Sequence, residues 1–255
     1  MSDIETHVAD GLAVVTINRP GQRNAMTLGM WREMAIIFTR LSGDADIRAI
    51  ILSGAGEDFS AGADISEFDD VRADPEQAAA YERAVDACSD AIESARQPTV
   101  AALSGYCLGG ACHLSMACDF RVADATAKIG IPAARLSIVY GVRSTQRLLA
   151  IVGLVAAKRI LFSGERIDCT EALRIGFVGR TGSSALEVAR EFVGRMVCNA
   201  PLSITGAKTI LTGLAKGALD LEEAERVIAQ AARSEDYQES RCAFAERRAP
   251  VFVGR

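Results

Sequence analysis

The sequence predicts an α/β fold in which strands and helices alternate in the first part of the chain and helices dominate the last. Short apolar runs rich in β-branched residues alternate with helical patterns up to Gly141, and helical patterns follow almost without interruption. The 255 residues, 49% apolar and 24% charged, suffice for one large soluble domain. We expect a core over residues 1–195 and a helical region over 196–255.

The first predicted elements are a strand, a helix and a second strand. Leu12–Asn18 is rich in β-branched residues and ends at an Arg-Pro-Gly turn. Thr27 can cap a helix over Leu28–Leu41, whose apolar residues recur on one face. Ile47–Leu52 is continuously apolar, which is typical of a strand buried on both faces, and a glycine-rich loop follows at 53–65.

A capped helix and a strand-to-helix turn come next. Asp74, followed by proline and then by glutamine at the capping-box position, predicts a helix that runs to Glu93. The strand at 99–103 ends in a Ser-Gly turn, and a helix opens after Gly109-Gly110. Free backbone N–H groups at such a helix start can hold an anion. A further strand is expected at 119–123.

The chain beyond Gly141 is predicted to be mainly helical, with one short strand near Phe177-Val178. Gly176 is expected to end one helix and Asp220 to cap another. The helical patterns lie at 143–151, 154–162, 170–174, 184–198, 202–216 and 221–235. We expect this region to cover the core or to meet a partner subunit.

Composition excludes several classes of partner. Lys and Arg number 28 against 33 Asp and Glu, and the resulting net charge of −5 disfavours a nucleic-acid surface. The opening MSDIETHVAD has no apolar run of signal-peptide length, and no stretch is long enough to span a bilayer. The seven cysteines form no CxxC pair, so no metal site is expected. Together these features predict a cytoplasmic protein without membrane or nucleic-acid partners.

Two loops of small residues are candidates for a binding site. In FSAGADI at 59–65, small side chains let backbone N–H groups approach a ligand, although the same residues also suit a tight turn. Gly109-Gly110 is open to the same two interpretations. A dinucleotide site fits worse, because neither GYCLGG nor GAGEDF makes the G-x-G-x-x-G pattern.

Five ordered segments together resemble the crotonase (enoyl-CoA hydratase/isomerase) superfamily. They are NRPGQRNAM at 18–26, FSAGADI at 59–65, SGYCLGGACHLSMACD at 104–119, GVRSTQRL at 141–148 and AFAERRAPVF at 243–252. The resemblance implies a spiral of ββα units with a helical C-terminal region that packs in homotrimers or dimers of trimers. It also implies an acyl-CoA thioester ligand, with coenzyme A present as part of the substrate and no separate cofactor.

The resemblance implies that the N–H groups of Ala61 and Gly110 form an oxyanion hole for the thioester oxygen. Such donors stabilise the charge that forms when chemistry occurs next to a thioester, and losing one typically costs about 2.7–4 kcal/mol. Family contacts to coenzyme A map onto Arg23, Ala63, Asp64, Ile65, Phe244 and Arg247. The last two match positions that often serve a neighbouring subunit. Surface charges free of any ligand are the alternative interpretation of the arginines.

The chain departs from its family where hydratases carry two glutamates that activate water. His113 stands three residues after Gly110, in the place of the first glutamate, and Ala133 replaces the second. A methyl group cannot transfer a proton, whereas a histidine titrating near neutrality can. We therefore do not expect the ordinary two-glutamate mechanism. His113 is either a polar or catalytic contact, or a histidine packed on a buried helix.

Tyr140 lies where the methylmalonyl-CoA decarboxylase branch of the family carries a functional tyrosine that contacts the substrate carboxylate. The leading interpretation is an acyl-CoA-processing enzyme that stabilises a thioester enolate, with His113 and Tyr140 facing the acyl end. Two alternatives stay open. One is a decarboxylase of a malonyl-type CoA thioester, which needs an oxyanion hole and no water-activating base. The other is an acyl-CoA-binding protein without catalysis.

Overall fold

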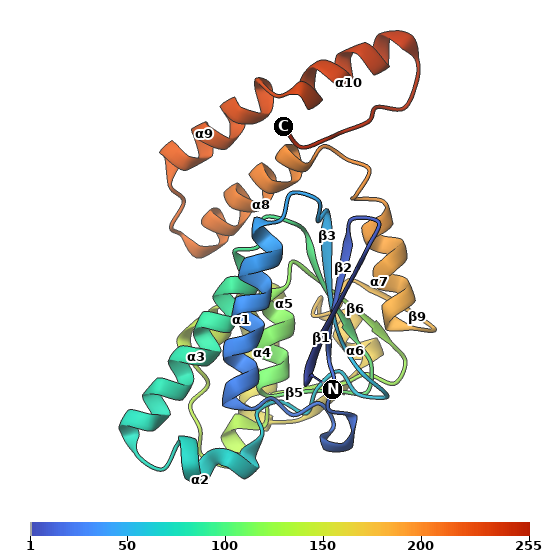
Figure 1. The fold of residues 1–255 in the computed structure, drawn as a ribbon. Coiled ribbons are helices and arrows are strands. Elements are labelled where there is room, and N and C mark those ends of the chain that lie inside the picture. The colour runs from blue at the N-terminus through green and yellow to red at the C-terminus, as the bar shows by residue number, and fades with distance from the viewer. Residues whose placement is uncertain (1) are drawn as a thin grey trace.

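The structure, a computed structural model, describes residues 2–255 and contains two β-sheets (Figure 1). The larger sheet has the order β1-β2-β3-β4-β6-β9, and every neighbouring pair except antiparallel β1-β2 is parallel. Its strands are β1 Ile4–Ala9, β2 Leu12–Ile17, β3 Ala49–Gly54, β4 Thr99–Leu103, β6 Phe120–Asp124 and β9 Arg180–Gly182. The smaller sheet consists of β5 Tyr106–Leu108, β7 Lys128–Gly130 and β8 Arg166–Asp168.

Successive ββα units pass from the larger sheet to the smaller one and then into a helix. After β4, the chain enters β5 and continues into helix α4, Gly110–Ala117. After β6, it enters β7, a 3-10 turn and helix α5, Val142–Ser163. Because β5 and β7 pair in parallel, the two units stack in the same direction. This repetition confirms the predicted α/β fold of crotonase type.

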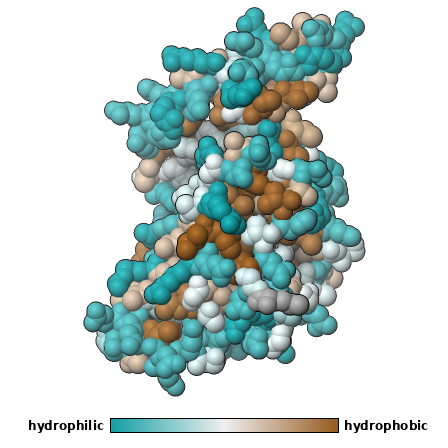
Figure 2. Space-filling view, viewed as in Figure 1, coloured by the Kyte–Doolittle hydropathy of each residue, from teal (hydrophilic) through white to brown (hydrophobic). Residues whose placement is uncertain are grey.

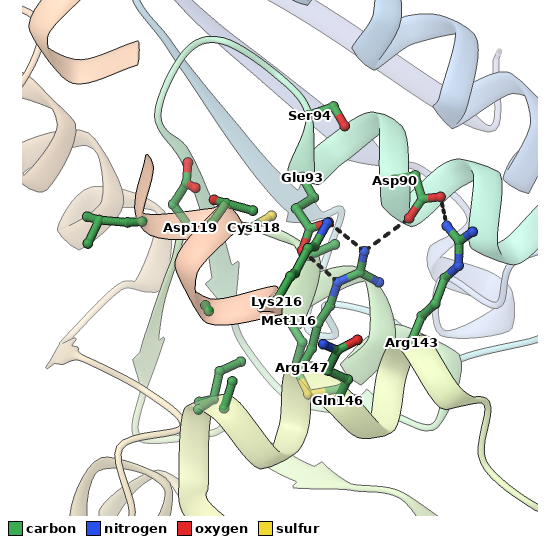
Figure 3. Close-up of a pocket in the computed structure, with 16 residues that line it drawn as sticks. Asp90, Glu93, Ser94, Met116, Cys118, Asp119, Arg143, Gln146, Arg147 and Lys216 are labelled. Atoms are coloured by element: carbon green, nitrogen blue, oxygen red, sulfur yellow. Dashed lines mark hydrogen bonds and ion pairs between the residues drawn. The ribbon is translucent and has the colours of Figure 1, made fainter. Parts of the chain in front are cut away.

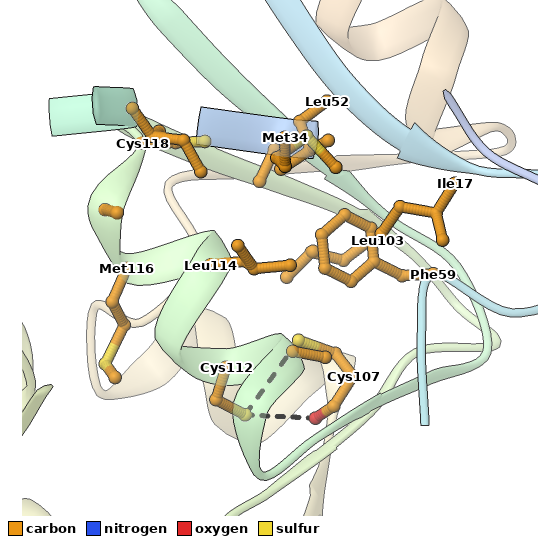
Figure 4. Close-up of a cluster of buried hydrophobic side chains, with 14 of the residues drawn as sticks. Ile17, Met34, Leu52, Phe59, Leu103, Cys107, Cys112, Leu114, Met116 and Cys118 are labelled. Atoms are coloured by element: carbon orange, nitrogen blue, oxygen red, sulfur yellow. Dashed lines mark hydrogen bonds between the residues drawn. The ribbon is translucent and has the colours of Figure 1, made fainter. Parts of the chain in front are cut away.

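The central strands β3 and β4 of the larger sheet are buried on both faces, which explains why they are continuously apolar. In β3, Ile50 and Leu52 belong to the main core, and the alternate residues Ala49 and Ile51 belong to a second core on the other face. Figure 1 shows α7 (Ala185–Gly194) on one side of this sheet and α1, α3, α4 and α5 on the other. Figure 4 shows Phe59, Leu103 and Leu114 meeting inside the main core.

The remaining helices complete the wall of the site and the C-terminal end. They are α1 Leu28–Gly43, α2 Phe68–Val71, α3 Pro75–Glu93, α6 Cys169–Arg174, α8 Pro201–Lys216, α9 Leu221–Ala232 and α10 Glu235–Glu246. Helices α8 to α10 lie at one end of the molecule and α2 at the other (Figure 1). On the face drawn in Figure 2, apolar side chains gather over the middle, between more hydrophilic ends.

Most predicted helix starts are confirmed by their caps. Thr27 accepts a hydrogen bond from Met30 N, Asp74 accepts one from Gln77 N, and Asp220 accepts two from the start of α9. Gly176, with φ +80°, follows the end of α6 as expected. The division of the chain after residue 195 stays a prediction.

Several elements differ from the prediction. The strand expected at 177–178 is found instead at β9. The two helices expected on either side of Gly153 are confirmed, because this glycine, with φ +72° and ψ +169°, is not helical and kinks α5 into two helical segments. Ser234 caps a separate helix, α10, so the helix predicted to 235 ends at Ala232. Strand β1 and the smaller sheet were not predicted.

In residues 2–255, no helix is long and apolar enough to cross a membrane. The same residues contain no group of three or more His, Cys, Asp or Glu side chains arranged to hold a metal ion.

Candidate active site

A small cavity of about 190 Å³ lies between α1, α3, the start of α4 and the segment that precedes α5. Its walls are mostly apolar and aromatic. They include Trp31, Phe68, Tyr81, Val85, Ile131 and Tyr140. Trp31 of α1 donates its indole N–H to the Tyr81 hydroxyl of α3 at 2.9 Å, so two of these walls are held together by a buried hydrogen bond. Burial raises the pKa of Tyr81 to about 12.

The two glycine-containing loops meet at this cavity because the loop after β3 pairs with β5. Ser60 N donates to Tyr106 O at 2.8 Å, and Leu108 N donates to Ser60 O at 3.2 Å. Gly62 has φ +98°, and a Cβ there would lie 2.4 Å from Leu108 O, so a side chain would force the loops apart. The pairing therefore places residues 61–63 beside Gly110.

Ala61 does not supply the predicted oxyanion donor. Its N–H donates to Arg23 O at 2.9 Å and so already serves to hold the loop against the segment after β2. Ala63 has no such partner. Its neighbours take part in a bridge to Met26, in which Met26 N donates to Gly62 O and Asp64 N donates to Met26 O. The N–H of Ala63 makes no hydrogen bond to any residue in the described part of the chain.

Gly110 carries a second N–H without an acceptor, and its predicted role as an oxyanion donor stays a prediction. It is the first residue of α4, where N–H groups lack acceptors within the helix, and within residues 2–255 it finds no other acceptor. A Cβ at this position would lie 3.4 Å from Ala63 N and 3.1 Å from the Trp31 ring, so the donors are neighbours. Ala63 and Gly110 together can stabilise one negatively charged oxygen.

Residue type could not separate Ala61 from Ala63 in the sequence, since both are alanines that flank Gly62. The difference lies in the backbone partner of each N–H group. That partner depends on how the segment at 23–26 packs against the loop at 59–65, and no sequence pattern predicts this packing.

His113 lines the cavity from α4 but is not poised to exchange protons near neutral pH. Its side chain is 3% exposed, and Nε2 lies 3.4 Å from Arg147 Nη1. A guanidinium can only donate, so Nε2 is the acceptor and the ring is neutral. Burial, and then the charge of Arg147, lower the pKa of His113 to about 3. His113 is therefore a polar contact that remains uncharged.

Arg147 is held behind His113 by carboxylates of α3. It donates to Glu93 at 3.0 and 3.1 Å, to Asp90 at 3.2 Å and to Ser89 at 3.0 Å. Figure 3 shows this cluster where it reaches a larger groove, with Lys216 of α8 bound to Glu93. Burial acts to raise the pKa of Glu93, but the bonds from Arg147 and Lys216 hold it below its ordinary value.

Tyr140 and Ala133 also line the cavity, as predicted, but neither replaces the missing carboxylates. The Tyr140 hydroxyl donates to Gly109 O at 3.1 Å and thus braces the turn before Gly110. Its ring lies edge-on to His113, with centroids 6.5 Å apart, and burial raises its pKa. Among the described residues that line the cavity, the one carboxylate belongs to Glu82 of α3, a residue that no sequence motif singles out.

Some of the residues predicted to bind coenzyme A line the cavity, and the others make contacts elsewhere. Ala63 and Ile65 line the cavity. Asp64 caps the following turn and pairs with Arg19 at 3.0 Å, and hydrogen bonds from Ser66 above all lower its pKa. Arg23 is exposed, and its guanidinium lies 4.9 Å from the centre of the Tyr106 ring.

Phe244 and Arg247 do not reach this cavity. Both lie at the end of α10, Phe244 is 87% exposed, and Figure 1 places α10 at the opposite end of the molecule from α2. Within one chain, these two residues therefore do not line the cavity, and their predicted contact with coenzyme A stays a prediction. It would require a second copy of the chain.

The stacked ββα units and the cavity beside the start of α4 define a crotonase-fold protein. The chain belongs to the enoyl-CoA hydratase/isomerase family, whose model matches residues 7–255. It is 34% identical to the short-chain-enoyl-CoA hydratase of Clostridium acetobutylicum, over 93% of this chain and 92% of that protein. It is 30% identical to the 2,3-dehydroadipyl-CoA hydratase of Escherichia coli, over the full length of both.

Solved structures give the same assignment. An enoyl-CoA hydratase/isomerase family protein from Hyphomonas neptunium is 34% identical, with a TM-score of 0.95 over 100% of this chain and 98% of that one. The enoyl-CoA hydratase of Bacillus anthracis is 31% identical, with a TM-score of 0.91 over the whole of both chains. The protein is thus an acyl-CoA enzyme of this family.

Proposed function

We propose that this protein converts an acyl-CoA thioester through its enolate, and that the N–H groups of Ala63 and Gly110 stabilise the charge on the thioester oxygen. The observation that carries the proposal is this pair of adjacent N–H groups, both without acceptors in residues 2–255, at an apolar cavity. The family supports it, because relatives are named for reactions of enoyl-CoA thioesters.

The enolate requires these donors because loss of a proton next to the thioester carbonyl moves negative charge onto its oxygen. Two N–H groups fixed by the backbone need no reorganisation, and aromatic walls that exclude water strengthen their effect. Addition of water by two glutamates is not supported, since Ala133 carries no acid and His113 is a neutral contact. We infer that proton removal and return, as in a double-bond isomerisation, is the reaction class.

Binding of an acyl-CoA without turnover is the second candidate, favoured by the replacement of both family glutamates. Decarboxylation of a malonyl-type thioester gains no support from the site. The Tyr140 hydroxyl proton is directed to Gly109 O. The arginine that lines the cavity, Arg72, is already paired with Glu82.

Exchange of the α-protons for deuterium tests the proposal directly. The protein is incubated in D2O with butyryl-CoA, crotonyl-CoA, hex-3-enoyl-CoA or methylmalonyl-CoA, and deuterium uptake and products are measured by mass spectrometry. Gly110→Ala would place a methyl 3.4 Å from Ala63 N. We expect it to lower exchange by about 100- to 1,000-fold, as loss of one oxyanion donor does.

Gly194→Ala is the matched control, because a Cβ there meets no atom within 4 Å. It should exchange at the wild-type rate, and circular dichroism should show both variants folded. Tight binding of a thioester by the wild type with neither exchange nor product would favour the binding protein. Release of carbon dioxide from methylmalonyl-CoA would instead support the alternative that the protein is a decarboxylase.

A further inference from the structure

We propose that Glu82 is the catalytic base that removes and returns the α-proton of the acyl-CoA, an inference that rests on the proposed function. The family positions for acid–base carboxylates hold His113 and Ala133 in this chain. Glu82 belongs to neither position, and it is the one carboxylate among the described residues that line the cavity.

The other polar titratable side chains that line the cavity already use their polar atoms in hydrogen bonds within the protein. The Nε2 atom of His113 accepts from Arg147, and the Tyr140 hydroxyl donates to Gly109 O. The Tyr81 hydroxyl accepts the indole proton of Trp31 deep in the wall. These groups either stay neutral or already use the atom that would transfer a proton. Among the described groups that line the cavity, Glu82 is therefore the base whose accepting atoms are not all engaged.

The position of Glu82 on α3 places its side chain at the cavity that Ala63 and Gly110 also line. Tyr81, Glu82 and Val85 all line the cavity, and residues 82 and 85 are one helical turn apart on one face. The Glu82 side chain is 48% exposed, so it stands at the rim and not in the sealed interior. A thioester oxygen at Ala63 and Gly110 would hold the acyl group between the donors and this rim.

Arg72 fixes the carboxylate without occupying both of its oxygens. Its guanidinium lies 4.9 Å from the centre of the Phe68 ring and 5.1 Å from that of Tyr81. From this stacked position, Arg72 Nη2 lies 3.1 Å from Glu82 Oε1. The second oxygen, Oε2, has no hydrogen-bond partner in the described chain. One oxygen is therefore oriented by an arginine and the other is available for a proton.

The proton transfer balances within this arrangement. Glu82 takes the α-proton, the electrons of that C–H bond form the carbon–carbon double bond of the enolate, and the charge moves to the thioester oxygen between Ala63 and Gly110. Return of the proton from Glu82 to the α- or γ-carbon restores the carboxylate. Return to the γ-carbon gives a shifted double bond, so the expected substrates are 2- and 3-enoyl-CoA thioesters.

Deuterium exchange into hex-3-enoyl-CoA and butyryl-CoA tests the assignment. Glu82→Gln keeps the size of the side chain and should lower exchange by at least 100-fold, as loss of a general base does, while the Kd for the thioester changes less than threefold. Glu76→Gln, at an exposed position on the first turn of the same helix, should exchange like the wild type. Arg72→Gln loses the ion pair but keeps the carboxylate, and should lose less than tenfold.

Chemical rescue separates proton transfer from a structural role. The rim position leaves access for a small acid, so added formate should raise exchange by Glu82→Ala at least tenfold and leave Glu76→Ala unaffected. Wild-type exchange by Glu82→Gln would overturn Glu82 as the base and leave the proposed function intact. Failure of formate to rescue, or an equal loss in Arg72→Gln, would reassign Glu82 to positioning the wall. Absence of exchange in the wild type would overturn both proposals.

Discussion

His113 shows that the surroundings of a side chain can set whether it is protonated. An exposed histidine titrates near neutrality, but His113 of α4 is buried and its Nε2 lies 3.4 Å from Arg147 Nη1. Protonation would bring two positive charges together in a site that also excludes water. Glu93 and Asp90 pair not only with Arg147 but also with Lys216 and Arg143, so their charge is already matched. Glu93 favours the imidazolium less than burial and Arg147 oppose it.

We predict that this histidine makes the protein less stable as the pH falls from 6.5 to 5. The unfolded chain binds a proton near pH 6.5, whereas the native pKa of His113 is about 3, so acid favours unfolding. The slope can reach about 1.4 kcal/mol per pH unit for one proton. Urea unfolding at several pH values measures it. His113→Gln should flatten the slope, and His7→Gln, at an exposed position, should not.

Sequence reasoning located the side chains of the site better than its backbone. His113, Ala133 and Tyr140 line the cavity, as their places beside Gly110, Pro132 and the segment at 141–148 indicate. The sequence indicates Ala61, whereas the N–H without an acceptor belongs to Ala63, because the acceptor for Ala61 comes from a distant segment of the chain. Glu82 was missed because α3 offers several acidic residues, and only its packing shows which one faces the cavity.

At the scale of elements, local chemistry predicted where helices begin, and tertiary packing decided the rest. Caps such as Thr27 and Asp74 act within one turn and could be identified from a few residues. The strands of the smaller sheet have three residues each, too few for an alternating pattern. The break at Gly153 could be predicted, because a glycine between two helical patterns can adopt the positive φ that ends the first of them.

The cluster around Arg147 joins three helices, and we predict that Glu93→Gln destabilises the protein by about 3 kcal/mol. Arg147 is 8% exposed, so removing its half-buried partner Glu93 leaves the buried charge only partly compensated by Asp90. The midpoint of urea unfolding measures the change. Glu191→Gln breaks an exposed ion pair on α7 and is the control, with no measurable change expected. An equal midpoint for both variants would contradict the prediction.

At the scale of the whole molecule, the C-terminal helices contact the core through a few polar links. Lys208 of α8 pairs with Asp119 at 2.8 Å and donates to Gln97 O, and Lys216 pairs with Glu93. Large apolar side chains on these helices remain exposed, which is unusual for a surface that meets only water. They include Leu211, Leu214, Leu221, Ile228 and Phe244. The sequence placed these helices correctly, but it could not show which of their faces the core leaves uncovered.

We predict that the protein forms a homotrimer, or a dimer of trimers, because a second and third copy would bury these apolar side chains. Light scattering after size exclusion should give three or six times the 27.0 kDa of one chain. Leu214→Asp combined with Ile228→Asp, at positions 59% exposed on α8 and α9, should shift the mass toward one chain. Val8→Asp, at an exposed apolar position on β1, is the control and should keep the assembly. A wild-type mass of one chain would show that Phe244 and Arg247 serve no neighbouring site.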